Sequence, residues 1–131
     1  MATIPDEYRD LLDRPITVAL ATLLPDGQPQ VNPVWCDYDG TYIRVNTGVG
    51  RQKYKDMLAR PQVTILAVDP DDAHRFLEVR GRVAKITEEG AAEQSRKLAH
   101  EYTGRDFPPS HGTGETRVIC LIEPVRVRGQ G

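Results

Sequence analysis

The sequence predicts a mainly β (α+β) protein, a six-stranded antiparallel β-barrel with flanking helices. Its 131 residues suit a single domain, residues 1–131, with a core of ordinary size. Six segments carry an apolar or alternating strand pattern, and most are joined by turns that use some of the 11 glycines and 10 prolines. Because few connections are long enough for a crossover helix, the pattern favours an antiparallel barrel over a parallel sheet.

The N-terminal part of the chain predicts a short helix and three strands. Pro5 suits a first helical turn, and Tyr8, Leu11 and Leu12 fall on one face before Pro15, so we expect this helix to pack on the sheet as a lid. The first strand is apolar on both faces and is therefore expected to be central. Turns containing Gly27 and Gly40 predict an antiparallel meander of three strands, at residues 16–24, 28–37 and 42–46.

The rest of the chain predicts two longer helices and three more strands. The first helix stops at the Arg60-Pro61 pair, and the second begins with Thr87 as its N-cap and lies against the outside of the barrel. The strand that precedes Thr87 alternates between an apolar face and a charged face. The expected order is helix 51–59, strand 62–68, strand 75–87, helix 88–102, loop 103–115 and closing strand 117–127.

Charge and cysteine content exclude several classes of function. A net charge of -2 gives no general attraction to nucleic acid, so we expect no nucleic-acid partner. No apolar run approaches the roughly 20 residues that span a bilayer, and no secretory signal pattern is visible, so we expect a cytoplasmic protein without a membrane partner. The two cysteines and three histidines show no metal-ligand spacing, so we expect no metal site.

A cationic turn between the third strand and the next helix is the most informative local feature. It runs through residues 48–55 and places Arg51, Lys53 and Lys55 in the first turn and a half of that helix. A helix N-terminus already carries partial positive charge, so these cations favour an anion, most simply a phosphate, at this place. The alternative is a solvated basic helix.

The order of motifs resembles the pyridoxamine 5'-phosphate oxidase-like split-barrel family of flavin and deazaflavin oxidoreductases. The most specific motif is ATLLPDGQPQVNPVW at residues 21–35, followed by Thr47-Gly48, by Arg51-Gln52-Lys53 and by PQVT at residues 61–64. The resemblance covers about Pro5 to Val127 and implies a split barrel of the FMN-binding type. The short chain and the Arg-x-Lys at the helix start are most similar to the branch that uses the deazaflavin coenzyme F420.

The resemblance implies two groups of cofactor-binding residues. One strand lies under the tricyclic ring and meets its pyrimidine edge, which assigns Gln30, Asn32, Pro33, Val34 and Trp35. Pro33 fits an exposed edge because it has no N–H to donate, whereas Trp35 is favoured as a dimer-interface aromatic over a ring contact. The second group holds the cofactor phosphate and comprises Thr47, Gly48, Arg51, Gln52 and Lys53. Three further cations extend this patch or are solvated: Arg44, Lys55 and Arg60.

The function that the resemblance implies is hydride transfer between reduced F420 and a small organic substrate. Separately, strands that are apolar on both faces lead us to expect a homodimer. FMN is the alternative cofactor, because Arg80 and Arg82 supply cations on a later strand. A non-catalytic flavin- or F420-binding protein is the third reading, and haem binding would need an axial ligand, for which His74 is a weak candidate. No catalytic residue is assigned, although candidate proton donors are present at His100, Tyr102 and His111.

Overall fold

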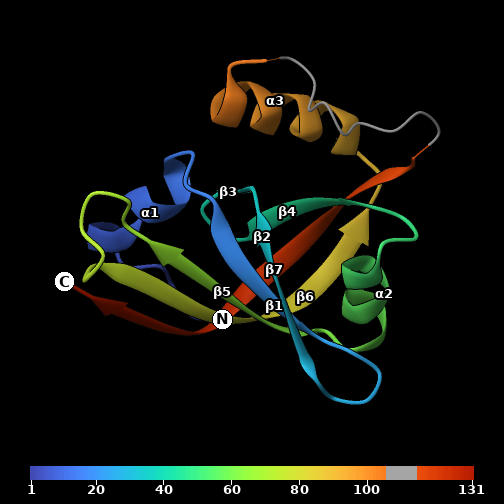
Figure 1. Ribbon diagram of the computed structural model, residues 1–131, viewed down its shortest axis with the longest axis horizontal. Helices are drawn as coiled ribbons and strands as arrows, with labels where there is room; N and C mark the ends of the chain where they lie inside the picture. The colour runs from blue at the N-terminus through green and yellow to red at the C-terminus, as the bar shows by residue number, and fades with distance from the viewer. Residues whose placement is uncertain (106–114) are drawn as a thin grey trace.

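The computed structural model describes residues 1–105 and 115–131, which form a curled antiparallel sheet flanked by helices (Figure 1). The predicted split-barrel class is confirmed, but the sheet has seven strands where six were predicted. Its order is β2-β1-β5-β6-β7-β4-β3, and every neighbouring pair is antiparallel. The strands are β1 (Val18–Leu23), β2 (Pro29–Val34), β3 (Cys36–Tyr38), β4 (Ile43–Gly48), β5 (Gln62–Val68), β6 (Phe76–Thr87) and β7 (Arg117–Gln130).

The additional strand arises because the predicted segment 28–37 is interrupted at Trp35. Before this residue β2 pairs with β1, and after it β3 pairs with β4. These two strands are consecutive in the chain yet form the two edges of the sheet. The expected three-stranded meander is therefore wrong: the chain passes from one edge to the other at Trp35, and the two hairpins lie at opposite edges.

The core lies on the concave side of the sheet and follows the predicted alternation. Fully buried side chains include Leu20 on β1, Val45 on β4, Ile65 on β5, Val79 on β6 and Ile122 on β7. β1 lies between β2 and β5, as its two apolar faces predicted. On β6 the charged side chains face outward and the apolar ones inward, also as predicted.

The helices cover the sheet at three places (Figure 1). The N-terminal segment folds as a 3-10 turn (Asp6–Tyr8) followed by α1 (Asp10–Asp13), whose Leu11 and Leu12 are buried as a lid. α2 (Gln52–Ala59) packs against β1, β4 and β6. α3 (Ala91–Thr103) packs against β7 and β4. No helix in the described ranges has both the length and the apolar character that a bilayer-spanning segment requires.

The boundaries of α3 and β7 differ from the sequence prediction. Thr87 is the last residue of β6, and its hydroxyl accepts a hydrogen bond from the Glu89 amide at 3.1 Å, so it stabilises the turn after the strand and is not the helix cap. The helix begins after Gly90, whose φ of +76° suits glycine. β7 continues beyond Val127 because it pairs with β6 as far as Gln130. Of the predicted loop 103–115, residues 106–114 lie outside the described part of the chain.

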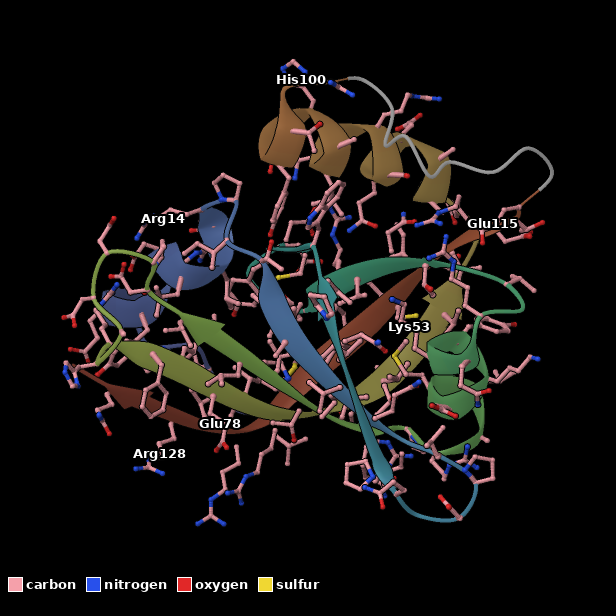
Figure 2. The ribbon with its side chains drawn as sticks, in the orientation of Figure 1. Arg14, Lys53, Glu78, His100, Glu115 and Arg128 are labelled. Carbon is pink, nitrogen blue, oxygen red and sulfur yellow. The ribbon has the colours of Figure 1, made fainter. Side chains whose placement is uncertain are left out.

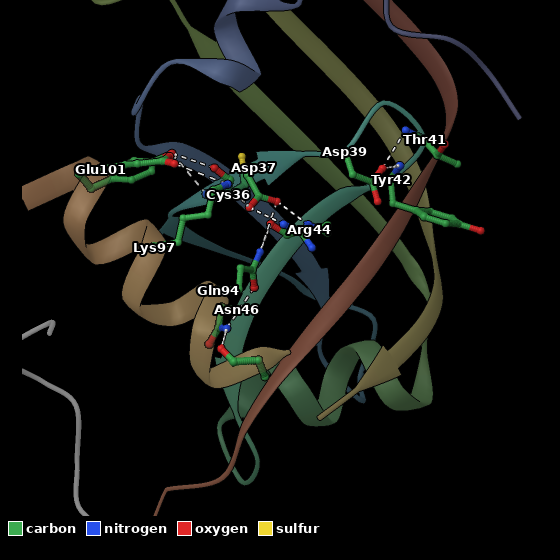
Figure 3. Close-up of polar contacts among 12 residues, drawn as sticks. Cys36, Asp37, Asp39, Thr41, Tyr42, Arg44, Asn46, Gln94, Lys97 and Glu101 are labelled. Atoms are coloured by element: carbon green, nitrogen blue, oxygen red, sulfur yellow. Dashed lines mark hydrogen bonds and ion pairs between the residues drawn. The ribbon is translucent and has the colours of Figure 1, made fainter. Parts of the chain in front are cut away.

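A buried carboxylate fastens α3 to the hairpin of β3 and β4 (Figure 3). Asp37 is 7% exposed and accepts hydrogen bonds from Arg44 Nε at 2.7 Å, Arg44 Nη2 at 2.8 Å and Lys97 Nζ at 3.0 Å. About one helical turn before Lys97 on α3, Gln94 Oε1 accepts a hydrogen bond from Asn46 Nδ2 on β4 at 3.0 Å. Burial alone would raise the pKa of Asp37, but the bonds from Arg44 and Lys97 outweigh it and hold this pKa below the usual 3.8.

A second contact fastens α3 at Trp35, where the chain passes from one edge of the sheet to the other. The Trp35 and Tyr102 rings stack with centroids 5.1 Å apart and planes at 19°. The Tyr102 hydroxyl donates to the Ile16 carbonyl at 2.8 Å and accepts from the Cys36 amide at 3.3 Å. One side chain of α3 thus holds both the start of β1 and the start of β3.

Replacing Tyr102 with Phe should lower the free energy of unfolding by about 1–3 kcal/mol, because the ring stack remains while two buried backbone groups lose their partner. Urea denaturation followed by the fluorescence of Trp35 would measure this loss. The matched control is Tyr38→Phe, which removes an exposed bond to the Gly40 carbonyl and should change stability by less than about 0.5 kcal/mol. Equal losses in the two variants would contradict the assignment.

Replacing Asp37 with Asn should lower the free energy of unfolding by about 1–3 kcal/mol at pH 7. A carboxylate whose pKa is depressed on folding stabilises the protein above its unfolded pKa, near 3.8, and this stability is lost as the pH falls through the lower folded value. The difference between wild type and Asp37→Asn should therefore shrink below about pH 4.

Chemical denaturation over a pH series would follow this change. The control is Asp13→Asn, which removes an exposed ion pair with Arg9 one helical turn away and should cost at most about 0.5 kcal/mol at pH 7. A pH-independent effect of Asp37→Asn would show that the charge of Asp37 is not what matters.

Candidate functional site

The cationic turn joins the end of β4 to the start of α2. The Val49 amide donates to the Thr116 carbonyl at 2.9 Å, which ties the turn to the chain just before β7. Gly50 has a φ of +99°, a backbone conformation that favours glycine. Arg51 is the N-cap residue of α2 but makes no side-chain capping bond. The partial positive charge of the helix start is therefore not met by a side chain of its own cap.

A carboxylate that the sequence did not reveal lies on this turn (Figure 2). Glu115 accepts hydrogen bonds from Arg51 Nε at 2.9 Å, Arg51 Nη2 at 3.0 Å and Arg117 Nη1 at 2.8 Å. Hydrogen bonding from Arg51 is the largest effect on the carboxyl, and with Arg117 it lowers the pKa of Glu115 to about 2. The carboxylate lies directly against Gly48, so a side chain at position 48 would collide with it.

Arg117 is the functional candidate that sequence reasoning missed. It is the first residue of β7 and lies opposite Gly48, the last residue of β4. Its Nε donates to Asn46 Oδ1 at 2.8 Å, which fixes the guanidinium beside the turn. The only sequence signal is an arginine at the start of the closing strand, and nothing in the pattern says that this strand pairs with β4.

Lys53 differs from the two arginines because its charge is not paired. It is half-buried and projects from α2 toward the strands (Figure 2). Desolvation lowers the pKa of its ammonium group, and repulsion from Arg51 and Arg117 lowers it further. Lys53 makes no hydrogen bond or ion pair with any residue in the ranges 1–105 and 115–131. The turn therefore holds a charged group for which the described chain provides no counter-ion.

Two predicted cofactor-binding residues carry buried polar atoms without a partner. Thr47 is 1% exposed, and its hydroxyl makes no hydrogen bond within the described residues. It lies on the core-facing side of β4 with Val45. The side-chain oxygen of Gln30 on β2 is also buried and also makes no hydrogen bond within the described residues. An unpartnered buried polar group costs about 1–3 kcal/mol, so such atoms are expected where a ligand or an ordered water completes the bonding.

The predicted ring-binding residues lie along β2, and the structure places this strand at an edge. One side of an edge strand presents unpaired backbone groups. Asn32 is half-buried, Pro33 is exposed and Val34 is buried, so their side chains alternate about the strand. Trp35 follows the strand and stacks on Tyr102 of the same chain. Its predicted place in a dimer interface stays a prediction.

Some predicted residues are engaged elsewhere. The Gln52 amide group donates to Asp56 Oδ1 at 2.8 Å and so belongs to the polar contacts of α2 itself. Arg44 binds Asp37, and Arg60 donates to the Leu23 carbonyl at 2.8 Å, so neither extends the cationic turn. Lys55 is exposed.

The three candidate proton donors differ in their surroundings. Both hydrogen-bonding directions of the Tyr102 hydroxyl are used by the chain, and burial raises its pKa, which argues against proton donation by this residue. His100 lies in the last turn of α3. His111 lies outside the described residues. No group of three or more His, Cys, Asp or Glu side chains within residues 1–105 and 115–131 has the arrangement of a metal site.

A groove of about 710 Å³ lies on the outer face of the sheet, away from the cationic turn. Its wall includes Arg80 and Arg82 on β6, the two cations on which the alternative cofactor FMN was based. Arg80 also forms an ion pair with Glu78 at 3.4 Å. The groove and the cationic turn share no residue, so the structure separates these arginines from Arg51 and Lys53.

Comparisons with known proteins agree with the fold and the motifs. The family model described as pyridoxamine 5'-phosphate oxidase matches residues 4–131. A solved protein named F420 reductase is 37% identical, with a TM-score of 0.84 over 95% of this chain and 98% of that chain. The conserved hypothetical protein Rv2991 from Mycobacterium tuberculosis is 26% identical, with a TM-score of 0.78 over 99% of this chain and 86% of that one.

A more distant similarity shows the fold alone. HutZ, the heme storage protein from Vibrio cholerae, is 15% identical, with a TM-score of 0.69 over 99% of this chain and 96% of that one. Comparison with curated protein sequences gives no match. Because the family model covers nearly the whole sequence and the strand order agrees with it, the chain belongs to the pyridoxamine 5'-phosphate oxidase family.

Proposed function

We propose that this chain is an F420-dependent oxidoreductase that acts on a small organic substrate. The observation that carries the proposal is the cationic turn, where Arg51, Lys53 and Arg117 meet and the charge of Lys53 is unpaired within the described chain. The similarity to a protein named F420 reductase supports the same cofactor. Three cations beside a helix start form a site for a phosphate group, which F420 and FMN both carry.

The residues present fit a flavin-like cofactor at two ends. Arg51, Lys53 and Arg117 would hold the phosphate, and Thr47 would supply a hydroxyl that makes no hydrogen bond within the described residues. Along β2, the free backbone side of the edge strand would meet the polar rim of the ring, with Gln30 contributing an unpartnered side-chain oxygen. When bound, F420 itself supplies the hydride chemistry, and the protein binds and orients it.

The chain's own contribution is binding, orientation and electrostatics. The arginine forks fix the direction of a phosphate through paired hydrogen bonds, whereas Lys53 adds a compact charge. Desolvation of Lys53 strengthens its attraction for an anion, since the charge is less screened than in water. Pro33 disfavours the pairing of a further strand with β2, because proline has no N–H to donate to a regular ladder of hydrogen bonds.

Replacing Lys53 with Ala should weaken F420 binding by about 10- to 150-fold, the equivalent of about 1.5–3 kcal/mol for a charge-assisted hydrogen bond to phosphate. A titration that follows F420 fluorescence would measure the dissociation constant. The control is Lys85→Ala, which removes an exposed cation on β6. Circular dichroism would check that both variants remain folded. Wild-type affinity in Lys53→Ala would contradict the assignment of the phosphate site.

The same titration separates the alternatives. FMN binding with a yellow purified protein, and no F420 binding at tens of micromolar, would favour the FMN-dependent reading. F420 binding without reduction of any acceptor in a broad panel would favour a non-catalytic binding protein. Turnover of reduced F420 with one acceptor class is the outcome expected from the proposal.

We further propose that the protein is a homodimer. Apolar side chains on the outer face of the sheet, Val31, Leu66, Val68 and Val125, remain between 37% and 61% exposed in the single chain. Light scattering at low concentration should give a dimeric mass, and Leu66→Glu should shift the mass toward the monomer because it places a charge on this apolar face. A monomeric wild-type mass would contradict this proposal.

A further inference from the structure

We propose that Glu115 is an internal competitor for the cationic turn: its carboxylate occupies the place of a phosphate group and has to leave Arg51 and Arg117 before that group binds. The identity of the natural ligand, F420, rests on the proposed function. The competition itself rests on the contacts of Glu115, and it can be tested with inorganic phosphate.

The geometry of Glu115 is that of a bound anion. Both of its oxygens are engaged, Oε2 by Arg51 and Oε1 by both arginines, at 2.8 to 3.0 Å. The Nε and Nη2 edge of Arg51 is thereby filled in the same way that a phosphate would fill it. A ligand that uses this edge must replace the carboxylate.

The space around the carboxylate supports the same conclusion. Glu115 lies against the backbone of Gly48, so close that a side chain at position 48 could be placed only if the carboxylate moved away. The three atoms nearest to this place belong to Glu115, and Arg51 and Arg117 hold its carboxylate there. The glycine in the Thr47-Gly48 motif therefore leaves room for an anionic group, and the carboxylate of Glu115 takes that place.

The balance of charge shows why the carboxylate can be displaced. Arg51, Lys53 and Arg117 contribute three positive charges and Glu115 one negative charge, so the cluster keeps an excess of two. Glu115 makes no hydrogen bond with Lys53. A phosphate group has more acceptor oxygens than a carboxylate and can engage Lys53 in addition to the arginine forks. The side chain of Glu115 is 21% exposed, so it has access to solvent when it leaves.

This arrangement predicts that neutralising Glu115 has opposite effects on stability and on binding. In the free protein its carboxylate offsets repulsion between two arginines, so Glu115→Gln should lower the melting temperature. The same variant no longer competes for Arg51 and Arg117, so it should bind phosphate more tightly. A residue that merely orients the arginines for a ligand would instead lose both stability and affinity on substitution.

The experiment measures binding of inorganic phosphate and, separately, of F420 to wild type, Glu115→Gln and Glu123→Gln by calorimetry and fluorescence titration. Glu123 lies on the same strand, away from the turn, and is the matched control. We expect Glu115→Gln to bind phosphate roughly tenfold more tightly, which corresponds to about 1.4 kcal/mol. The double variant Arg51→Ala/Glu115→Gln should lose this gain, because the competition is for Arg51. If Glu115→Gln does not fold, Glu115→Asp should change affinity in the same direction.

The outcomes separate this inference from the proposed function. Equal or weaker phosphate binding by Glu115→Gln, or no phosphate binding by either protein, would overturn the competition. If wild type binds F420 and Glu115→Gln gains no affinity, the competition is wrong while the cofactor assignment stands. If Glu115→Gln gains phosphate affinity but neither protein binds F420, the competition stands and the cofactor assignment is wrong.

Discussion

The break in the second extended segment, at Trp35, is the constraint on which the rest of the molecule depends. It sends the chain from one edge of the sheet to the other, so that β2 keeps a free edge and β4 becomes available to β7. The pairing of β4 with β7 then places Gly48 opposite Arg117. Without this change of edge, the turn after β4 would have neither its second arginine nor its carboxylate.

Side-chain contacts from α3 and β4 hold the chain at the break, between the pairing of β2 with β1 and the pairing of β3 with β4. Trp35 stacks on Tyr102, while Asp37 accepts bonds from Arg44 on β4 and from Lys97 on α3. Aromatic stacking and charge-assisted bonds are directional, so they fix the angle at which the chain turns. The polar contacts under α3 continue through Gln94 and Asn46 to Arg117. The polar contacts that hold α3 and those of the candidate site thus form one connected set.

Much of the fold could be predicted because local pattern decides it. The outward charged face of β6 and the buried Leu11 and Leu12 follow from periodicity alone, and each is confirmed. The end of the segment 28–37 could not be predicted, since the pattern continues through Trp35 while the pairing partner changes. Thr87 was misplaced for a related reason. Its hydroxyl suits a helix cap or a turn equally, and the left-handed Gly90 decided where α3 begins.

For the site, the sequence by itself determined the cationic turn, because Arg51 and Lys53 follow a glycine turn at fixed spacing after a strand. It also determined the family, through motifs that lie close together in the chain. Only the tertiary structure decided what faces these cations. Glu115 and Arg117 are 64 or more residues from Arg51 in the chain, and they reach it through strand pairing, which depends on long-range contacts. The burial of Lys53, Thr47 and Gln30 was decided in the same way, since burial is a property of packing and local spacing does not encode it.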